Sequence, residues 1–255
     1  MDFMISAYTD VGIVKETNQD SLSVMILNTP QGRMAFAVLC DGMGGLAKGE
    51  VASAAVIHAF RRWATEELPK LCAAPLEDVT IRSQWEKIIT DQNELIKTYG
   101  ARQGVRLGTT AVVLLLTQNR SYLLNVGDSR AYLLRDGLYQ LTADQTFVAR
   151  EIALGHMTPE QALVDPRRNV LLQCVGASER VYPDMFFGEV QPGTVYMLCS
   201  DGFRHEITPQ EIYEKLQPVR MTDEETMRRS AWELVELNKQ RRERDNISVA
   251  LIKTL

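Results

Sequence analysis

The stretch from Met34 to Ala52, MAFAVLCDGMGGLAKGEVA, limits the possible folds more than any other part of the chain. Its apolar run, Ala35 to Cys40, is short, partly aromatic and β-branched, and followed at once by turn residues, so it predicts a buried strand. The strand is expected to end at Asp41, and the glycine-rich segment 42–45 predicts a turn before a helix that begins near Gly49. A carboxylate at the end of a buried strand, with a glycine backbone behind it, is well placed to bind a cation.

Asp-Gly is also the commonest signal for a two-residue hairpin, and the chain contains this dipeptide three times. Asp136-Gly137 lies between AYLLR and LYQL, two strand-like runs of similar length, and therefore predicts an ordinary hairpin. Asp41 and Asp201 instead follow more hydrophobic runs, AFAVLC and VYMLCS, and lead toward helix starts. We interpret these two aspartates as functional residues.

The composition is that of a globular protein, with 45% hydrophobic and 24% charged residues in 255. Nothing resembles a linker, so we expect a single domain over residues 1–255. The net charge of −5 and the scattered arginine pairs argue against nucleic-acid binding. The start, MDFMISAYTD, lacks the pattern of a signal peptide, and the longest purely apolar run, Ala111 to Leu116, is far too short to cross a bilayer. We therefore expect no membrane association and a cytoplasmic protein.

The cysteines are widely spaced and contain no C-x-x-C pair; they are Cys40, Cys72, Cys174 and Cys199. Two of them fall inside predicted core strands. We expect all of them to be reduced and buried, without a disulfide framework or a zinc site.

Strand and helix patterns come in blocks along the chain. Helical periodicity covers about 49–68 and 83–99, whereas residues 108–141 contain four strand-like runs with short connections, which predict an antiparallel meander. Thr158 and Thr208 each begin a capping box with Pro at the first helical position, and Thr222 with Glu225 predicts a third helix start. Blocks of this kind favour an α+β domain in which largely antiparallel sheets are covered by helices.

Several aspartates are predicted just outside strands or turns, at well-separated positions. They are Asp20, Asp41, Asp144, Asp201 and Asp245. Each alone is an ordinary turn residue, but together they are typical of an oxygen-rich site for hard divalent cations. The three histidines are dispersed and no H-E-x-x-H is present, which disfavours zinc-dependent hydrolysis.

Eight short motifs in one order resemble the bacterial form of the type-2C metal-dependent protein phosphatases, the PPM family. In this chain they read TDVG (9–12), NQD (18–20), DGMGG (41–45) with GE (49–50), GTT (108–110), NVGDSR (125–130), LTAD (141–144), CSDG (199–202) and RDNI (244–247). They cover nearly the whole chain. One such motif would be weak evidence, whereas eight in order are specific.

The resemblance implies the type-2C fold, a four-layer α-β-β-α sandwich of two antiparallel sheets flanked by helices, with a flap at about 145–190 beside the active site. It implies that Asp41 bridges two Mn²⁺ or Mg²⁺ ions at one end of the sandwich and that the Gly42 carbonyl adds a ligand. Direct or water-mediated contacts from Asp20, Asp201 and Asp245 would complete the pair. Asp144 would hold a third, weaker ion.

The implied activity is hydrolysis of phosphoserine or phosphothreonine in proteins by a metal-bridging hydroxide, without a phosphoenzyme. Phosphorylated proteins, and a cognate Ser/Thr kinase with its substrates, would be the partners of a monomeric enzyme. Lys15 stands where the family usually has an arginine that grips phosphate through two hydrogen bonds. Because lysine is a point charge without the planar fork, we expect weaker and less directional phosphate binding.

Two alternatives remain open from the sequence. Cys174 and Arg180 have the C-x5-R spacing of cysteine-based phosphatases, although Gln173 replaces the usual preceding histidine and Ala177 an expected glycine. The second alternative is a catalytically weak or inactive phosphatase-fold protein that serves as a regulatory or binding module, for which Lys15 is the main argument.

Overall fold

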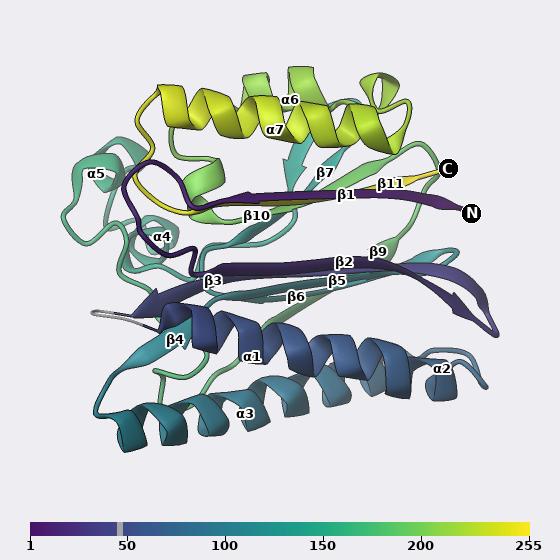
Figure 1. The fold of residues 1–255 in the computed structure, drawn as a ribbon, viewed down its shortest axis with the longest axis horizontal. Helices are drawn as coiled ribbons and strands as arrows, with labels where there is room; N and C mark the ends of the chain where they lie inside the picture. The colour runs from purple at the N-terminus through teal and green to yellow at the C-terminus, as the bar shows by residue number, and fades with distance from the viewer. Residues whose placement is uncertain (45–47) are drawn as a thin grey trace.

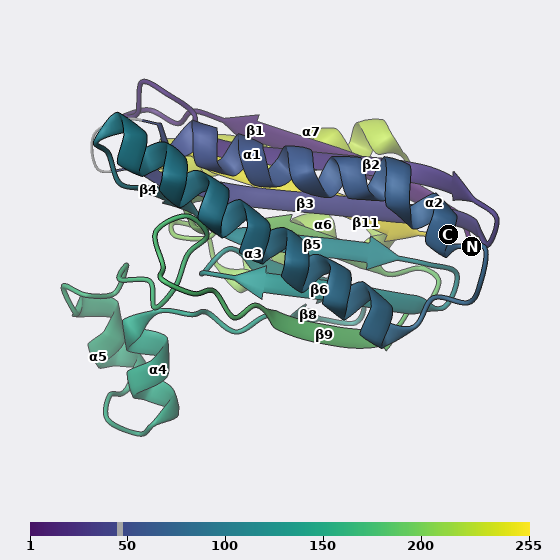
Figure 2. The same ribbon diagram turned by 90° about the horizontal axis from the view of Figure 1, so that it is seen from below.

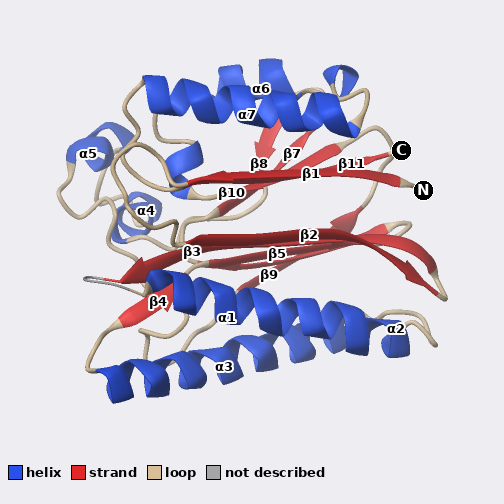
Figure 3. Cartoon of the chain, viewed as in Figure 1, coloured by secondary structure: helices blue, strands red, loops and turns tan. Residues whose placement is uncertain are grey.

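A computed structural model describes residues 1–44 and 48–255. Two antiparallel sheets lie face to face, and helices cover the outer face of each sheet (Figure 1, Figure 3). The expected α-β-β-α sandwich is confirmed. No helix in the described part of the chain is both long and apolar enough to span a membrane.

The first sheet has the strand order β1-β11-β10-β7-β8. Its strands are β1 (Phe3–Asp10), β7 (Arg130–Leu134), β8 (Leu138–Gln140), β10 (Val195–Cys199) and β11 (Ile247–Thr254). The predicted hairpin at Asp136-Gly137 is confirmed, because it joins the antiparallel pair β7 and β8. The outer face of this sheet is covered by α6 (Pro209–Leu216) and α7 (Glu224–Gln240), with a short 3-10 turn at Pro218–Arg220 between them (Figure 1).

The second sheet has the order β2-β3-β5-β6-β9, and β4 extends it by pairing with the end of β3. Its strands are β2 (Asp20–Thr29), β3 (Gly32–Gly44), β4 (Leu107–Thr109), β5 (Ala111–Leu116), β6 (Arg120–Val126) and β9 (Asp184–Glu189). Its outer face is covered by α1 (Gly49–Arg62), which continues through a π-helical turn (Trp63–Glu67) into α2 (Leu68–Leu71), and by α3 (Asp78–Gln103) (Figure 2).

Alternation along the strands builds separate apolar layers. On β3, Phe36, Val38 and Cys40 face the helices, where Phe36 packs in an aromatic cluster with Trp63 and Trp85. The intervening Ala37 and Leu39 face the space between the sheets. This two-residue period explains why the run reads as apolar throughout: both of its faces are buried. All four cysteines are buried and free, as expected.

Four local expectations need correction. The predicted meander is wrong, because β5 and β6 belong to one sheet while β7 and β8 belong to the other, so the chain crosses the sandwich at residues 127–129. The strand does not stop at Asp41: β3 continues to Gly44 and pairs with β4, and Gly45 lies outside the described residues. Residues 184–189 of the expected flap form β9 and pair with β6. Asp223, rather than Thr222, caps α7 by accepting a hydrogen bond from the Thr226 amide.

Residues 145–183 lie between β8 and β9 and carry α4 (Phe147–Ala153) and α5 (Pro159–Val164), which project from one end of the sandwich (Figure 2). The capping boxes at Thr158 and Thr208 are both present, as predicted. The two chain termini lie at the opposite end (Figure 1).

Candidate metal centre

The site begins with two aspartates that face each other across neighbouring strands. Asp20 is the first residue of β2, and the antiparallel register places it directly opposite Asp41 on β3. Side chains of such a pair share one face of the sheet, and two like charges in this position repel each other. The sheet therefore holds two carboxylates together at its end, an arrangement that needs a counter-cation.

Neither oxygen of the Asp20 carboxylate has a hydrogen-bond partner among the described residues, although the side chain is buried. Burial raises the pKa of Asp20 to about 7, and the charges of Asp201 and Asp245 contribute. The hydroxyls of Ser248 and Ser200 lower this pKa by a smaller amount, but the Ser248 hydroxyl is paired with that of Thr9 at 2.7 Å. A buried, unpaired carboxylate is costly unless a cation accompanies it.

The carboxylate of Asp41 is also placed where its charge is unfavourable, and its pKa is raised further than that of Asp20. Burial raises the pKa of its carboxyl well above the usual range, and the nearby charge of Asp20 adds to the effect, followed by Asp201. The Asp41 backbone is fixed in place, because its amide donates to the Thr110 hydroxyl at 2.9 Å and its carbonyl accepts from the Thr110 amide at 2.9 Å. The fixed backbone therefore places the carboxylate in an environment that disfavours its charge.

Asp201 and Asp245 reach this end of the sandwich from the other sheet. Asp201 begins a 3-10 turn (Asp201–Phe203) directly after β10, and Asp245 lies in the loop before β11. The two loops are in backbone contact: a Cβ on Gly202 would lie 2.3 Å from the Asn246 carbonyl oxygen. One oxygen of Asp201 is also buried without a hydrogen-bond partner in the described part of the chain.

Gly42 lies where β3 meets the start of α1. A Cβ at this position would lie 2.3 Å from the carbonyl oxygen of Gly49 and 2.5 Å from that of Gln19, so only glycine fits. The contact holds the backbone that follows Asp41 close to the segment before Asp20.

In addition to burial, the charges of Asp201 and Asp245 raise the pKa values of Asp20 and Asp41, but the four carboxylates do not form a complete set of metal ligands. Within residues 1–44 and 48–255, no three His, Cys, Asp or Glu side chains are arranged to hold a metal ion by themselves. The orphaned oxygens of Asp20 and Asp201 nevertheless fit hard divalent cations, which take carboxylates, backbone carbonyls and water as ligands.

Asp144, which the sequence predicts as a ligand of a third ion, is paired with an arginine in the structure. Its two oxygens each accept a hydrogen bond of 2.7 Å from the Arg130 guanidinium, and an Arg204 nitrogen lies 3.7 Å away. A carboxylate engaged in a bidentate arginine pair is already neutralised, so this geometry argues against a metal ligand.

Asp128 lies with the carboxylates instead, and the sequence reasoning missed it. It is buried in the crossing between β6 and β7, and burial raises its pKa to about 6, with the Asp201 charge as the next cause. Its charge in turn contributes to the raised pKa of Asp41. Gly-Asp-Ser looks like a turn in sequence, and only the chain crossing places this aspartate inside the sandwich.

Lys15 lies beside the carboxylates, with its ammonium 3.1 Å from an Asp245 oxygen, and it remains partly exposed. Its loop is anchored by Asn246, whose side-chain amide donates to the carbonyls of Val11 and Thr17 at 2.9 and 3.2 Å. The Asn246 side-chain oxygen accepts from the Gln19 amide at 2.8 Å. Asn246, which the sequence reasoning left without a role, thus fixes the loop that presents Lys15.

The arrangement around Cys174 argues against a cysteine nucleophile. The side chain is buried, and burial raises the pKa of its thiol, whereas a nucleophilic cysteine needs a lowered one. The amides that would have to bind phosphate are already used: that of Val175 donates to the Thr109 carbonyl and that of Gly176 to the Asn93 side chain.

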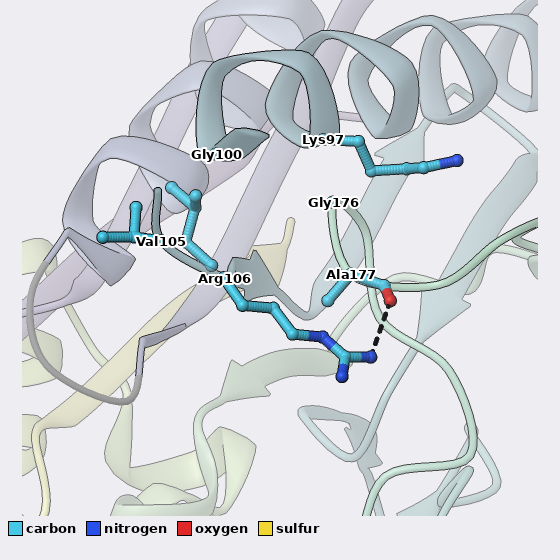
Figure 4. A pocket seen from close by; sticks show the side chains of 7 residues that line it. Lys97, Gly100, Val105, Arg106, Gly176 and Ala177 are labelled. Atoms are coloured by element: carbon cyan, nitrogen blue, oxygen red, sulfur yellow. Dashed lines mark hydrogen bonds between the residues drawn. The ribbon is translucent and has the colours of Figure 1, made fainter. Parts of the chain in front are cut away.

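The loop that follows Cys174 borders a pocket of about 270 Å³ between the end of α3 and the start of β4 (Figure 4). Its walls include Lys97, Arg106 and Ala177, and the Arg106 guanidinium donates to the Ala177 carbonyl at 3.1 Å. None of the predicted ligands lines it.

Comparison with known proteins identifies relatives of the chain. The family model described as protein phosphatase 2C matches residues 13–242. The serine/threonine protein phosphatase PstP of Mycobacterium tuberculosis is 35% identical over 247 residues, 96% of this chain and 44% of PstP, so the chain spans less than half of that relative.

Solved structures show the same fold. The serine/threonine phosphatase of S. agalactiae superposes with a TM-score of 0.85 at 27% identity over 100% of both chains. The catalytic domain of PstP, crystallised in complex with two manganese ions, superposes with a TM-score of 0.80 at 30% identity over 99% of this chain and 98% of that one. From the family match over residues 13–242 and the relatedness to PstP, the chain belongs to the protein phosphatase 2C family.

Proposed function

We propose that this chain hydrolyses phosphoserine and phosphothreonine in proteins with the help of two Mn²⁺ or Mg²⁺ ions. The observation that carries the proposal is the opposed pair of Asp20 and Asp41, two carboxylates with raised pKa at the end of one sheet. The ligands would be Asp20, Asp41, the Gly42 carbonyl, Asp201 and Asp245. A third ion would be held by Asp128 and Asp201, in place of the Asp144 site expected from the sequence.

A bound metal pair would supply an activated water and would neutralise charge on the phosphoryl group. The chain itself supplies position and charge. Lys15 presents an accessible ammonium next to Asp245, where it can meet a phosphate oxygen as substrate enters. Cys174, the cysteine with a phosphatase-like spacing, is buried, and burial raises the pKa of its thiol, which supports direct attack by water over a covalent intermediate.

Phosphorylated proteins are the proposed substrates, since relatives of the chain are named serine/threonine protein phosphatases. A cognate Ser/Thr kinase, a monomeric state and a cytoplasmic location are further proposals, carried over from the sequence analysis. Residues 145–183 would act as the flap beside the site, because they project from the same end of the sandwich as the carboxylates.

The first prediction concerns metal dependence. Purified protein with Mn²⁺ should hydrolyse p-nitrophenyl phosphate and a phosphothreonine peptide, and excess EDTA should abolish both reactions. Cys174→Ser should retain most of the activity, because the thiol takes no part. Turnover that survives EDTA but is lost in Cys174→Ser would support the cysteine mechanism, and no turnover with Mn²⁺ would favour a regulatory or binding module.

The second prediction concerns Lys15→Arg. The arginine fork can make two parallel hydrogen bonds to a phosphate, so the variant should have a KM for the phosphopeptide lowered by several-fold, with little change in kcat. Lys253→Arg, remote from the site, is the matched control. An unchanged or raised KM in the Lys15 variant would mean that this side chain does not contact the phosphate.

A further inference from the structure

Arg130, Asp144 and Arg204 form a group of charges next to the carboxylates. Arg130 and Asp144 make two hydrogen bonds of 2.7 Å, and their side chains are only 24% and 14% exposed. Arg204 approaches the same carboxylate at 3.7 Å and is 14% exposed. The group is therefore far more buried than an ordinary surface ion pair, and its geometry is well defined.

Each arginine belongs to a segment that carries a proposed metal ligand. Arg130 begins β7, two residues after Asp128. Arg204 ends the 3-10 turn that begins at Asp201, and its amide donates to the Asp201 carbonyl at 3.0 Å. The Arg204 guanidinium also donates to the Asp128 backbone carbonyl at 3.1 Å. Arg204 thus joins directly the two segments that hold Asp128 and Asp201.

Asp144 is itself fixed by the chain crossing between the sheets. The preceding Thr142 accepts from the Ala131 amide, and the Ala143 carbonyl accepts from the Asn125 side chain. The backbone amide of the following Gln145 donates to the Gly127 carbonyl, and the Gly127 amide donates to the side-chain oxygen of Gln145. The loop that carries Asp144 is therefore tied to both sides of the segment that carries Asp128.

We propose that Arg130, Asp144 and Arg204 act as a buried clamp that positions Asp128 and Asp201 to bind divalent cations. The inference rests on the proposed function, since it assigns these aspartates to the metal centre. The three clamp residues are positioning residues and touch neither metal nor substrate. Outer residues of this kind commonly contribute a factor of 10–100 to metal affinity.

Charge and position make opposite predictions for Arg204. If it acted only through its charge, its removal would leave the carboxylates more negative and Mn²⁺ would bind more tightly. If it acts by holding the Asp128 and Asp201 segments together, its removal should weaken Mn²⁺ binding. Arg204→Met keeps the length and packing of the side chain but removes the charge and the hydrogen-bond donors, so it separates the two effects.

The test is calorimetric titration of Mn²⁺ alone into the metal-stripped full chain. Arg204→Met and Asp144→Asn should each raise the Kd for Mn²⁺ by about 10-fold or more. Asp78→Asn is the matched control: it breaks another Asp–Arg pair, between Asp78 at the start of α3 and Arg120 at the start of β6, and should leave the Kd unchanged. Circular dichroism at the titration temperature establishes that each variant is folded.

Unchanged or tighter binding in Arg204→Met would overturn the clamp. Asp144→Asn leaves the Arg130 charge unpaired and can unfold the chain, whereas Arg204→Met leaves the Arg130–Asp144 pair intact and keeps the test decisive. If the wild-type chain binds Mn²⁺ and both variants bind it equally well, the clamp fails and the proposed function stands. If the wild-type chain binds no Mn²⁺, the metal centre itself is refuted.

Discussion

Asp41→Asn should lower kcat/KM for a phosphothreonine peptide by about 1,000-fold, which corresponds to about 4 kcal/mol of transition-state stabilisation. The amide has nearly the shape of the carboxylate but lacks the charge that would hold the cations. The measurement is steady-state kinetics at saturating Mn²⁺. Asp136→Asn is the control, because it makes the same change in an Asp-Gly dipeptide that forms an ordinary hairpin. Near-wild-type turnover in Asp41→Asn would refute the site assignment.

The same variant should stabilise the metal-free fold. Asp41 and Asp20 face each other with their pKa values raised by burial, so at neutral pH their charges oppose folding when no cation is present. Removing one charge should raise the Tm in EDTA by a few °C, since about 1 kcal/mol shifts the Tm of a chain of this size by about 2–4 °C. Mn²⁺ should raise the Tm of the wild type and have little effect on the variant. A lower Tm in EDTA would mean that the carboxylate is satisfied within the protein.

Gly42→Ala should have the second large effect. The added methyl group would lie within 2.6 Å of three backbone atoms of Gly49 and Gln19, none of which can rotate away. Overpacking of this kind costs about 1–3 kcal/mol in stability. Because the displaced backbone carries Asp41, activity should fall by about 100-fold, the order expected for a shift of about 1 Å at a catalytic group.

Gly188→Ala is the matched control for Gly42→Ala. Gly188 also lies in a strand, but a Cβ there would meet only the rotatable Ser121 hydroxyl, at 3.0 Å. It should therefore leave both activity and Tm close to those of the wild type. Urea unfolding and kinetics on the two variants test the pair, and an active, stable Gly42→Ala protein would show that the contact between β3 and α1 can relax.

The layers of the fold could be predicted from the sequence because burial determines which positions along a strand or helix are apolar. The run from Ala35 to Cys40 is apolar at every position since helices cover one face of β3 and the opposite sheet covers the other. The capping boxes at Thr158 and Thr208 depend only on residues close together in the sequence, so they can be recognised from the sequence alone. The distribution of strands between the two sheets is not local: nothing in the Gly127-Asp128-Ser129 segment distinguishes a hairpin turn from a crossing.

The same limit explains why the sequence favours Asp144 as a ligand whereas the proposed metal centre contains Asp128. Both aspartates follow strand-like runs, and either could be a ligand on sequence grounds. What separates them is the position of two arginines, one of which, Arg204, lies about sixty residues further along the chain, next to Asp201. Pairing with Arg130 neutralises Asp144, while Asp128 is left in the acidic group. Only the folded chain shows which carboxylate is already paired.

The most direct test of the metal centre is anomalous diffraction from crystals of the full chain grown with Mn²⁺. The proposed metal centre predicts two manganese peaks at the end of the sandwich opposite the termini, with Asp41 between them and with Asp20, Asp201 and Asp245 around the pair, and a third peak beside Asp128 and Asp201. Manganese peaks remote from these side chains, or none at saturating Mn²⁺, would contradict it.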